Sequence, residues 1–464
     1  MKQFVAIFLL SAAGCLGGDE AMLTDVNALH ADGPTALHWA VQEDSVARVK
    51  SLIAAGADAK VANHYGVTPL SLACVDGNEV IVKALLAAGA DPNTTLRGGE
   101  SALMTAARTG RIGPVQALLA AGAKVDATDR KGQTALMWAA ADGHLAVVDA
   151  LVKAGADIHR RLNSGFTAFH FAVREGRAAV VESLLKAGAD ANSAIKADTV
   201  SALILAVENG HFELALTLVK AGGDPNDQRS GFTALHTLTW VRKPNRGDDE
   251  SGQPPPAGSG ELTSLDFARE LVRLGADVNA ALRRGAAGRG SVPAPGATPF
   301  LLAAKTADVP LMRVLVELGA DPSRPNHEGC TPLMAAAGLG TRAPTEEAGT
   351  EAEALEAVAY LLSLGAEVNT VDKNGETAMH GAAYKNLPKM VKFLAEKGAR
   401  IDVWNQQNKR GWTPLLIAEG YRPGNFKPSA ETIAALHEVM RAAGVTPPPL
   451  TERKSDTTKG YQTP

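Results

Sequence analysis

The sequence has no excess of basic residues, no long apolar run and few aromatic residues. The first two absences argue against particular classes of protein. Basic residues are not in excess: 46 lysines and arginines stand against 50 acidic residues, a formal net charge of −4, which disfavours broad nucleic-acid binding. No apolar run reaches the length of about 18 residues that a membrane-spanning helix needs. Aromatic residues occupy only 5% of the 464 positions, as is typical of arrays built from alanine, leucine and glycine.

What the sequence does contain is a repeated glycine. Gly56, Gly89, Gly122, Gly155 and Gly188 are 33 residues apart, and each closes a phrase such as AAGAD or KAGAD. A fixed period of this length indicates an array of small repeats rather than one globular core.

Residues 131–163 illustrate one repeat. Thr134 precedes an apolar-rich run, where its hydroxyl can cap the first helical N–H groups. Gly143 ends this short helix and His144 opens a second one, which carries an apolar stripe at helical spacing. Gly155 follows as a left-handed cap. Helices this short are unstable alone, so we expect each pair to bury its apolar face against the neighbouring pairs.

These phrases resemble the ankyrin repeat, whose signature begins G-x-T-P-L-H-x-A and ends V-x-x-L-L-x-x-G-A-D-x-N. The sequence has DGPTALHWA at 32–40, YGVTPLSLA at 65–73 and NGETAMHGA at 374–382, with endings such as ADPN at 90–93. The resemblance implies an all-α ankyrin-repeat solenoid over residues 33–444: about eleven helix–turn–helix repeats, short hairpin turns and three to four inserted loops. The Thr or Ser that opens each repeat lies at 35, 68, 101, 134, 167, 201, 233, 298, 331, 377 and 413.

Residues 1–18 resemble a short bacterial export signal: Lys2 precedes the apolar run 4–10 and a group of small residues. Cys15 follows Ala12-Ala13-Gly14, which resembles a lipobox, so Cys15 is a candidate lipidation site. The expected location is exported, periplasmic or anchored to the outer membrane. The alternative is a buried helix of a degenerate first repeat, in a cytoplasmic protein. Residues 19–32 are interpreted as a truncated first repeat, and 445–464 as a disordered polar tail.

The later repeats depart from the period. Inserts are expected at 242–263, 281–296 and 340–354, with a further extension at 421–431. Inserts in such arrays become surface loops. They are either tolerated at little cost or form a partner-specific collar. In the ankyrin family, loops between paired helices and hairpins between repeats project from opposite edges. The insert at 281–296 is therefore expected to face away from the others.

Catalytic chemistry is not indicated. No G-x-S-x-G, H-E-x-x-H or GK[ST] pattern occurs, so no catalytic residue, cofactor or metal is predicted. His38, His170, His236 and His380 share one position of non-adjacent repeats, where the family uses a hydrogen bond between neighbouring repeats. Of the remaining cysteines, Cys74 is expected in the core. Cys330 lies in a repeat turn, roughly 60 Å from Cys74 along the stack and too far for a disulfide.

We therefore predict a non-catalytic, monomeric scaffold that binds a protein or peptide, with no nucleic acid and no membrane span. The alternative is a cytosolic regulator or antidote of a partner enzyme. The contact residues are expected on the concave face formed by the first helices and in the inserts. Trp39 and Trp138 are interpreted mainly as packing residues. The candidate partner-binding residues are Arg108, Arg174, Trp240, Arg242, Lys243, Arg283, Arg284 and Tyr384.

Overall fold

The computed structural model describes residues 26–29, 33–197, 199–245, 254–284, 295–342, 344, 347–421 and 427–449. The predicted export signal at 1–18 with Cys15, most of residues 19–32 and the tail from 450 onward lie outside the described residues, as do parts of the inserts at 242–263, 281–296 and 340–354.

The described residues form helices and no extended sheet, with isolated bridges at Thr95–Ser101 and Ala194–Ser201. This confirms the all-α solenoid of paired helices. The first helices of the repeats are α1 (Ala36–Gln42), α3 (Pro69–Asp76), α5 (Ala102–Thr109), α7 (Ala135–Asp142), α9 (Ala168–Arg174), α11 (Ala202–Glu208), α13 (Ala234–Arg242), α15 (Pro299–Lys305), α17 (Pro332–Ala336), α19 (Ala378–Tyr384) and α22 (Pro414–Ala418). The second helices are α2 (Val46–Ala54), α4 (Glu79–Ala87), α6 (Ile112–Ala120), α8 (Leu145–Lys153), α10 (Ala178–Lys186), α12 (Phe212–Lys220), α14 (Ser264–Arg273), α16 (Val309–Glu317), α18 (Glu351–Ser363), α20 (Pro388–Glu396) and α23 (Ala430–Ala442).

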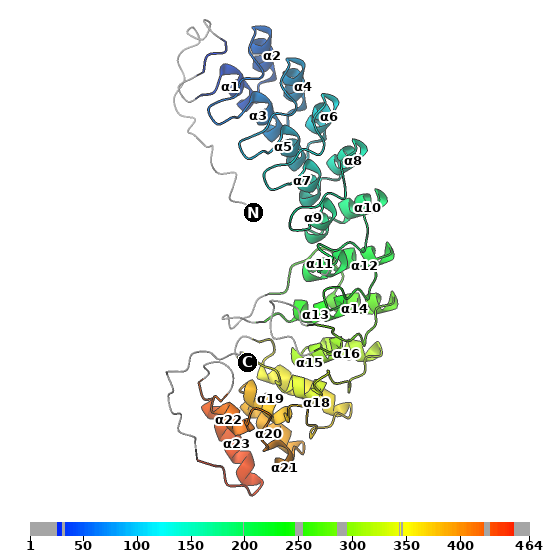
Figure 1. Cartoon of the computed structure of the whole chain (residues 1–464), viewed down its shortest axis with the longest axis vertical. Coiled ribbons are helices and arrows are strands. Elements are labelled where there is room, and N and C mark those ends of the chain that lie inside the picture. The colour runs from blue at the N-terminus through cyan, green and yellow to red at the C-terminus, as the bar shows by residue number, and fades with distance from the viewer. Residues whose placement is uncertain are drawn as a thin grey trace. The chain divides into compact units, whose positions relative to one another are not determined.

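Two compact units are distinguished along the chain. Unit 1 contains Met1–Ala172 and Ala179–Ala187, and unit 2 contains Val173–Ala178 and Gly188–Pro464. Within unit 1, α1, α3, α5 and α7 pack side by side in one layer, and their partners α2, α4, α6 and α8 form a second layer (Figure 1). The hairpins between repeats, which we call fingers, project from the first-helix layer (Figure 1).

Capping side chains and left-handed glycines mark the ends of the helices. Met137 N donates to Thr134 Oγ1 at 3.3 Å, which confirms the predicted N-cap of α7. Gly143 has φ 86° and Gly155 φ 88°, the left-handed conformation that glycine adopts most cheaply. The core keeps the same period. The side chains of valines spaced 33 residues apart are fully buried in unit 1, at Val49, Val82, Val115, Val148 and Val181.

Asparagines at the ends of repeats join neighbouring repeats. Asn93 Nδ2 donates to Gly122 O at 3.3 Å, and Asn93 Oδ1 accepts from Lys124 N at 2.8 Å. Each such asparagine bonds the next repeat's glycine carbonyl and the N–H two residues further on. We call this series the asparagine ladder; its members are Asn27, Asn93, Asn192, Asn226, Asn279 and Asn369.

The described part of the first insert is held against the preceding repeat. Ser259 Oγ hydrogen-bonds with His211 Nδ1 at 2.9 Å, and the N–H groups of Glu261 and Leu262 donate to Glu213 Oε1 at 2.9 and 3.1 Å. A Cβ at Gly210 would meet Pro256 O at 3.1 Å, so this glycine allows the close approach. The segment 256–262 is therefore a docked strap over the turn before α12.

Three details differ from the sequence prediction. Residues 351–354, predicted as insert, form the first turn of α18, because Thr350 caps the helix and Glu353 completes a capping box. The last helix, predicted at 433–443, begins three residues earlier at Ala430. A short helix not predicted, α21 (Ile401–Trp404), follows the ending of its repeat and buries Trp404.

Candidate functional site

The first helices of unit 1 turn one side away from the second helices. On this side the side chains of Trp39 and Val75 are 39% and 51% exposed. Leu72 and Trp138 are half-buried at the position that Trp39 occupies in its own repeat. We call Trp39, Leu72, Val75 and Trp138 the apolar row. Trp39, interpreted from sequence as mainly a packing residue, is thus open to solvent.

Arg108, one of the candidate contact residues, lies beside this row. Its guanidinium carbon is 5.6 Å from the centre of the Trp138 ring, and its Nη2 is 3.4 Å from Glu100 Oε1. Thr105 Oγ1 also donates to Glu100 at 3.1 Å. These contacts orient the Arg108 guanidinium without burying it, because its side chain remains 41% exposed. A cation over an exposed aromatic face contributes about 0.5–1 kcal/mol.

The position that Trp39 and Trp138 occupy is buried at Thr105 of unit 1 and in unit 2. The residues that correspond to Trp39 and Trp138 are Leu205, Thr237, Leu302 and Ala335, which are between 0% and 6% exposed. From the sequence, contact residues are expected on the concave face formed by the first helices and in the inserts of the later repeats. Among the described residues, the open apolar side chains of the first helices lie instead in the regular repeats of unit 1.

Trp240, Arg242 and Lys243 require a correction, because they do not form an exposed aromatic beside two cations. Trp240 and Arg242 belong to α13, and Lys243 caps that helix. The Trp240 ring is half-buried and packs edge-on against Phe232, with ring centres 5.2 Å apart.

Arg242 forms a buried ion pair with Asp308 of the next repeat. Its Nε and Nη2 donate to the two carboxylate oxygens at 2.7 and 3.0 Å, and its Nη1 donates to Ser264 Oγ. The Arg242 side chain is 18% exposed and that of Asp308 is 1% exposed. This cation therefore ties repeats together and is not available to a partner.

Lys243 is likewise engaged within unit 2, where its Nζ pairs with Glu353 Oε1. Burial alone would raise the pKa of the Glu353 carboxyl, but hydrogen bonds from Lys243 and Thr350 hold it below its usual value. The third insert was expected to be a surface loop, but its Glu353 pairs with Lys243 at the end of α13.

Tyr384 also requires a correction, because it is only 8% exposed. Its hydroxyl donates to Glu376 Oε1 at 2.8 Å, and Asn408 Nδ2 donates to the same carboxylate at 2.8 Å. Burial raises the pKa of Glu376, and burial next to that carboxylate raises the pKa of Tyr384 as well. Tyr384 thus belongs to a buried hydrogen-bond network of unit 2.

The remaining predicted contact residues lie at the surface but are oriented by the protein. Arg174 donates to Glu175 Oε1 through its Nε at 2.9 Å. Arg283 and Arg284 are exposed in the finger between α14 and α15, on the hairpin side expected for the second insert. Arg283 N donates to Gly231 O at 2.9 Å, and Arg284 Nη2 donates to Arg229 O at 2.5 Å.

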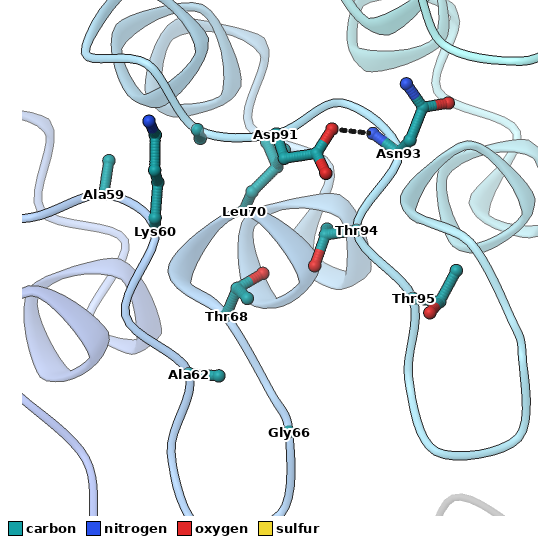
Figure 2. Close-up of a pocket in the computed structure, with 11 residues that line it drawn as sticks. Ala59, Lys60, Ala62, Gly66, Thr68, Leu70, Asp91, Asn93, Thr94 and Thr95 are labelled. Carbon is teal, nitrogen blue, oxygen red and sulfur yellow. Dashed lines mark hydrogen bonds between the residues drawn. The ribbon is translucent and has the colours of Figure 1, made fainter.

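A pocket of about 500 Å³ lies in unit 1 between the fingers that follow α2 and α4, above the start of α3 (Figure 2). Lys60 and Ala62 line one side, Thr94 and Thr95 line the other, and Thr68 and Leu70 form the floor. Asp91 lies between them and accepts a hydrogen bond from Asn93 N at 2.9 Å (Figure 2). Lys60 occupies the position of a ladder asparagine, so this gap in the asparagine ladder coincides with the pocket.

The described residues contain no cluster of His, Cys, Asp or Glu that could hold a metal ion. Cys74 and Cys330 are free and buried, and burial raises the pKa of each thiol to about 12, so neither is a thiolate near neutral pH. None of the helices in the described ranges combines the length and apolar character needed to cross a bilayer.

Comparison with known proteins places these features in a family. The family model for ankyrin repeats in three copies matches residues 6–96, 81–162, 103–195, 169–241 and 348–427, which together exceed half of the chain. The chain is 32% identical over 235 residues to a putative palmitoyltransferase ZDHHC13 of Danio rerio, covering 47% of this chain and 32% of that protein. It is 38% identical over 103 residues to ankyrin repeat and SAM domain-containing protein 6 of Rattus norvegicus, covering 22% and 10%.

A third relative, neurogenic locus notch homolog protein 1 of Homo sapiens, is 32% identical over 172 residues, covering 37% of this chain and 6% of that protein. The chain spans a third or less of the length of these three relatives. Ankyrin repeats in general mediate protein–protein interactions. With its repeat signature, capped helix pairs and matched segments, the chain belongs to the ankyrin repeat family.

Proposed function

We propose that this chain is a non-catalytic scaffold that binds another protein through the apolar row of unit 1. The observation that carries the proposal is the exposure of Trp39 and Val75 on the free side of the first helices. Large apolar side chains at the centre of an interface, with an oriented arginine beside them, are the residues that typically dominate binding energy. Arg108 over Trp138 supplies that arrangement here.

Val75→Asp tests the proposal, with Val80→Asp as a matched control. Both valines are exposed in unit 1, at 51% and 47%, but Val80 lies on the second helix α4. Affinity capture with the full chain, followed by quantitative mass spectrometry, would compare the two variants with the unchanged protein. We expect partner recovery to fall by about tenfold for Val75→Asp and to stay unchanged for Val80→Asp.

Equal recovery with both variants would contradict the proposed face, and loss with Val80→Asp alone would assign binding to the second helices. Trp39→Ala is an independent test of the same face, because the Trp39 ring lies on that face but in a different repeat from Val75. Circular dichroism of each variant separates loss of binding from loss of folding.

The inserted loops are a second proposed contact. The exposed Pro254 and Pro255 precede the strap that is docked on Glu213, so their position next to α12 is held by the fold. Replacing these two prolines with alanine leaves the strap in place and tests the loop alone. Unchanged partner recovery would remove the loop from the proposal.

We further propose that the protein is exported by a bacterium, with Cys15 as the candidate lipidation site, and acts as a monomer. The sequence pattern at residues 1–18 supports this. Fractionation of tagged protein tests it: cytosolic material that retains Met1 would favour the alternative, a cytosolic regulator or antidote of a partner enzyme.

A further inference from the structure

Three consecutive fingers of unit 1 carry exposed cations, near the tip in the first two and toward the base in the third. They are residues 94–101, 127–134 and 160–167. Arg97, Arg130, Lys131, Arg160 and Arg161 are all exposed, and we call them the basic ridge. We propose that the basic ridge binds an extended acidic segment of the partner protein. The proposal rests on the proposed scaffold function and names the chemistry of its partner.

The acidic side chains in or next to these fingers are engaged within the protein. Glu100 pairs with Arg108 at 3.4 Å. Asp129 Oδ1 accepts from Lys131 N and Gln133 N, both at 2.8 Å. Asp126 Oδ1 accepts from Asp157 N at 3.0 Å. These carboxylates shape the turns, while the side chains of Arg130, Lys131 and Arg160 form no ion pair with any described residue.

Two arginines of the ridge are held in place by backbone carbonyls. Arg97 Nη2 donates to His64 O at 2.6 Å, and Arg161 Nη1 donates to Gly165 O at 3.0 Å. A guanidinium has five N–H donors, so the single bond of Arg97 leaves donors for an incoming carboxylate. The anchored arginines are therefore oriented before binding, which reduces the entropy that binding costs.

The first two of these fingers are joined. Arg130 N donates to Gly98 O at 3.2 Å. A Cβ at Gly99 would approach Asp129 Cα to 3.3 Å, so the two tips pack closely. The spacing between successive repeats is about 9 Å, which is close to three residues of an extended chain at about 3.3 Å each. Arg97 and Arg130, at the same position of successive fingers, therefore match acidic residues about three positions apart in an extended peptide.

The same features disfavour a nucleic acid. A nucleic acid carries a phosphate at every nucleotide, and so it would also lie against exposed carboxylates at the finger bases such as Asp91 and Asp157. Single-stranded nucleic acids also need aromatic platforms for their bases. The only aromatic residue of the three fingers is Phe166, which is half-buried against Phe171 with ring centres 5.2 Å apart.

Fluorescence anisotropy with the full chain tests the proposal. The probe is a labelled synthetic peptide with glutamate at every third position, and the control peptide carries glutamine instead. The ridge variant combines Arg97→Glu, Arg130→Glu and Arg160→Glu. The matched control combines Lys50→Glu, Lys153→Glu and Lys186→Glu, exposed lysines on the second helices of unit 1 that give the same change in net charge.

We expect the glutamate peptide to bind the unchanged protein and the lysine control, and to bind the ridge variant at least about tenfold more weakly. Equal weakening by both variants would mean that only net charge matters and would overturn the proposal. So would equal binding of the glutamine peptide, or tighter binding of single-stranded DNA or of phosphatidylglycerol vesicles. If Val75→Asp loses the cellular partner but the ridge variant keeps it, the scaffold function stands and the ridge proposal fails.

Discussion

At the residue scale, the repeated histidine shows how one position serves two contacts. Thr233 N donates to His236 Nδ1 at 3.1 Å, so Nδ1 is the acceptor and Nε2 carries the hydrogen, which it donates to Ala297 O at 3.1 Å. His38 makes the equivalent bonds to Thr35 N at 3.2 Å and Val67 O at 2.9 Å. The neutral tautomer thus caps its own helix and ties it to the next repeat. A second proton at Nδ1 would face an N–H group.

This geometry predicts a loss of stability in mild acid. Burial lowers the pKa of His236 to about 4, against an ordinary value of 6.5, and the carbonyl of Ala297 opposes this only in part. Below pH 6.5 the unfolded chain takes up a proton that the folded chain refuses, so stability falls as the pH falls toward 4. The expected loss is about 3 kcal/mol for this histidine. Urea unfolding measured between pH 7 and pH 4 would follow it.

The variant His236→Gln should show a shallower decline over the same range, whatever its stability at pH 7. A substitution at the exposed His64 serves as a control that leaves the contacts of His236 intact. The same slope in His236→Gln and the unchanged protein would contradict the assignment.

The ion pair between Arg242 and Asp308 gives a second prediction at this scale. Arg242→Met keeps the apolar stem but leaves a buried carboxylate without its partner, so we expect a loss of about 3 kcal/mol in the free energy of unfolding. Asp308→Asn added to it should recover most of that loss, because the amide can still cap α16. The exposed pair Arg269–Asp266, at 3.1 Å, is the control, and Arg269→Met should cost less than about 1 kcal/mol. A similar urea midpoint for both methionine variants would contradict the prediction.

At the element scale, neighbouring repeats are joined by the asparagine ladder as well as by apolar packing. The two hydrogen bonds of each asparagine connect backbone groups of successive repeats at fixed positions. Lys60 interrupts this series between the repeats that end at Gly56 and Gly89, and its side chain lies alongside Gly89, with Cε 3.7 Å from the position of an added Cβ. The ladder asparagine is therefore missing at the pocket shown in Figure 2.

Lys60→Asn should restore the missing bonds and stabilise unit 1. Two hydrogen bonds in this exposed setting are expected to contribute about 1 kcal/mol to the free energy of unfolding. Asn93→Ala, which removes a ladder member in the same unit, should lower stability by a similar amount. Urea midpoints measure both. We expect the urea midpoint to rise for Lys60→Asn and to fall for Asn93→Ala. A midpoint for Lys60→Asn that stays unchanged or falls would show that the ladder does not act at this position.

At the scale of the whole molecule, stability in such an array comes from contacts between adjacent repeats, so a local change should act locally. The two buried cysteines make this testable, because Cys74 lies in unit 1 and Cys330 in unit 2. Their thiols are shielded in the folded protein, where burial raises both pKa values to about 12. A thiol reagent should therefore modify them only when the surrounding repeats open.

In a Cys15→Ser background, Arg242→Met in unit 2 should speed the labelling of Cys330 more than that of Cys74. Mass spectrometry of peptides after timed labelling measures the two rates separately. Asn93→Ala in unit 1 should show the reverse preference. Equal acceleration at both cysteines by either variant would mean that the array opens as a single cooperative body.

The sequence alone determined the family, the repeat boundaries and most helix ends. These depend on contacts within three or four residues, such as Thr134 capping α7 or Gly155 closing α8, and local contacts leave a local pattern. Only the tertiary structure decided which candidate contact residues are free. Arg242 pairs with Asp308, 66 residues away in the sequence, and Lys243 pairs with Glu353, 110 residues away. No spacing pattern in the sequence predicts pairs this far apart. The exposure of each side chain was likewise decided only by the tertiary structure. Trp39 and Leu205 occupy the same position of their repeats, yet the first is 39% exposed and the second 6%, a difference that the shared repeat position does not predict.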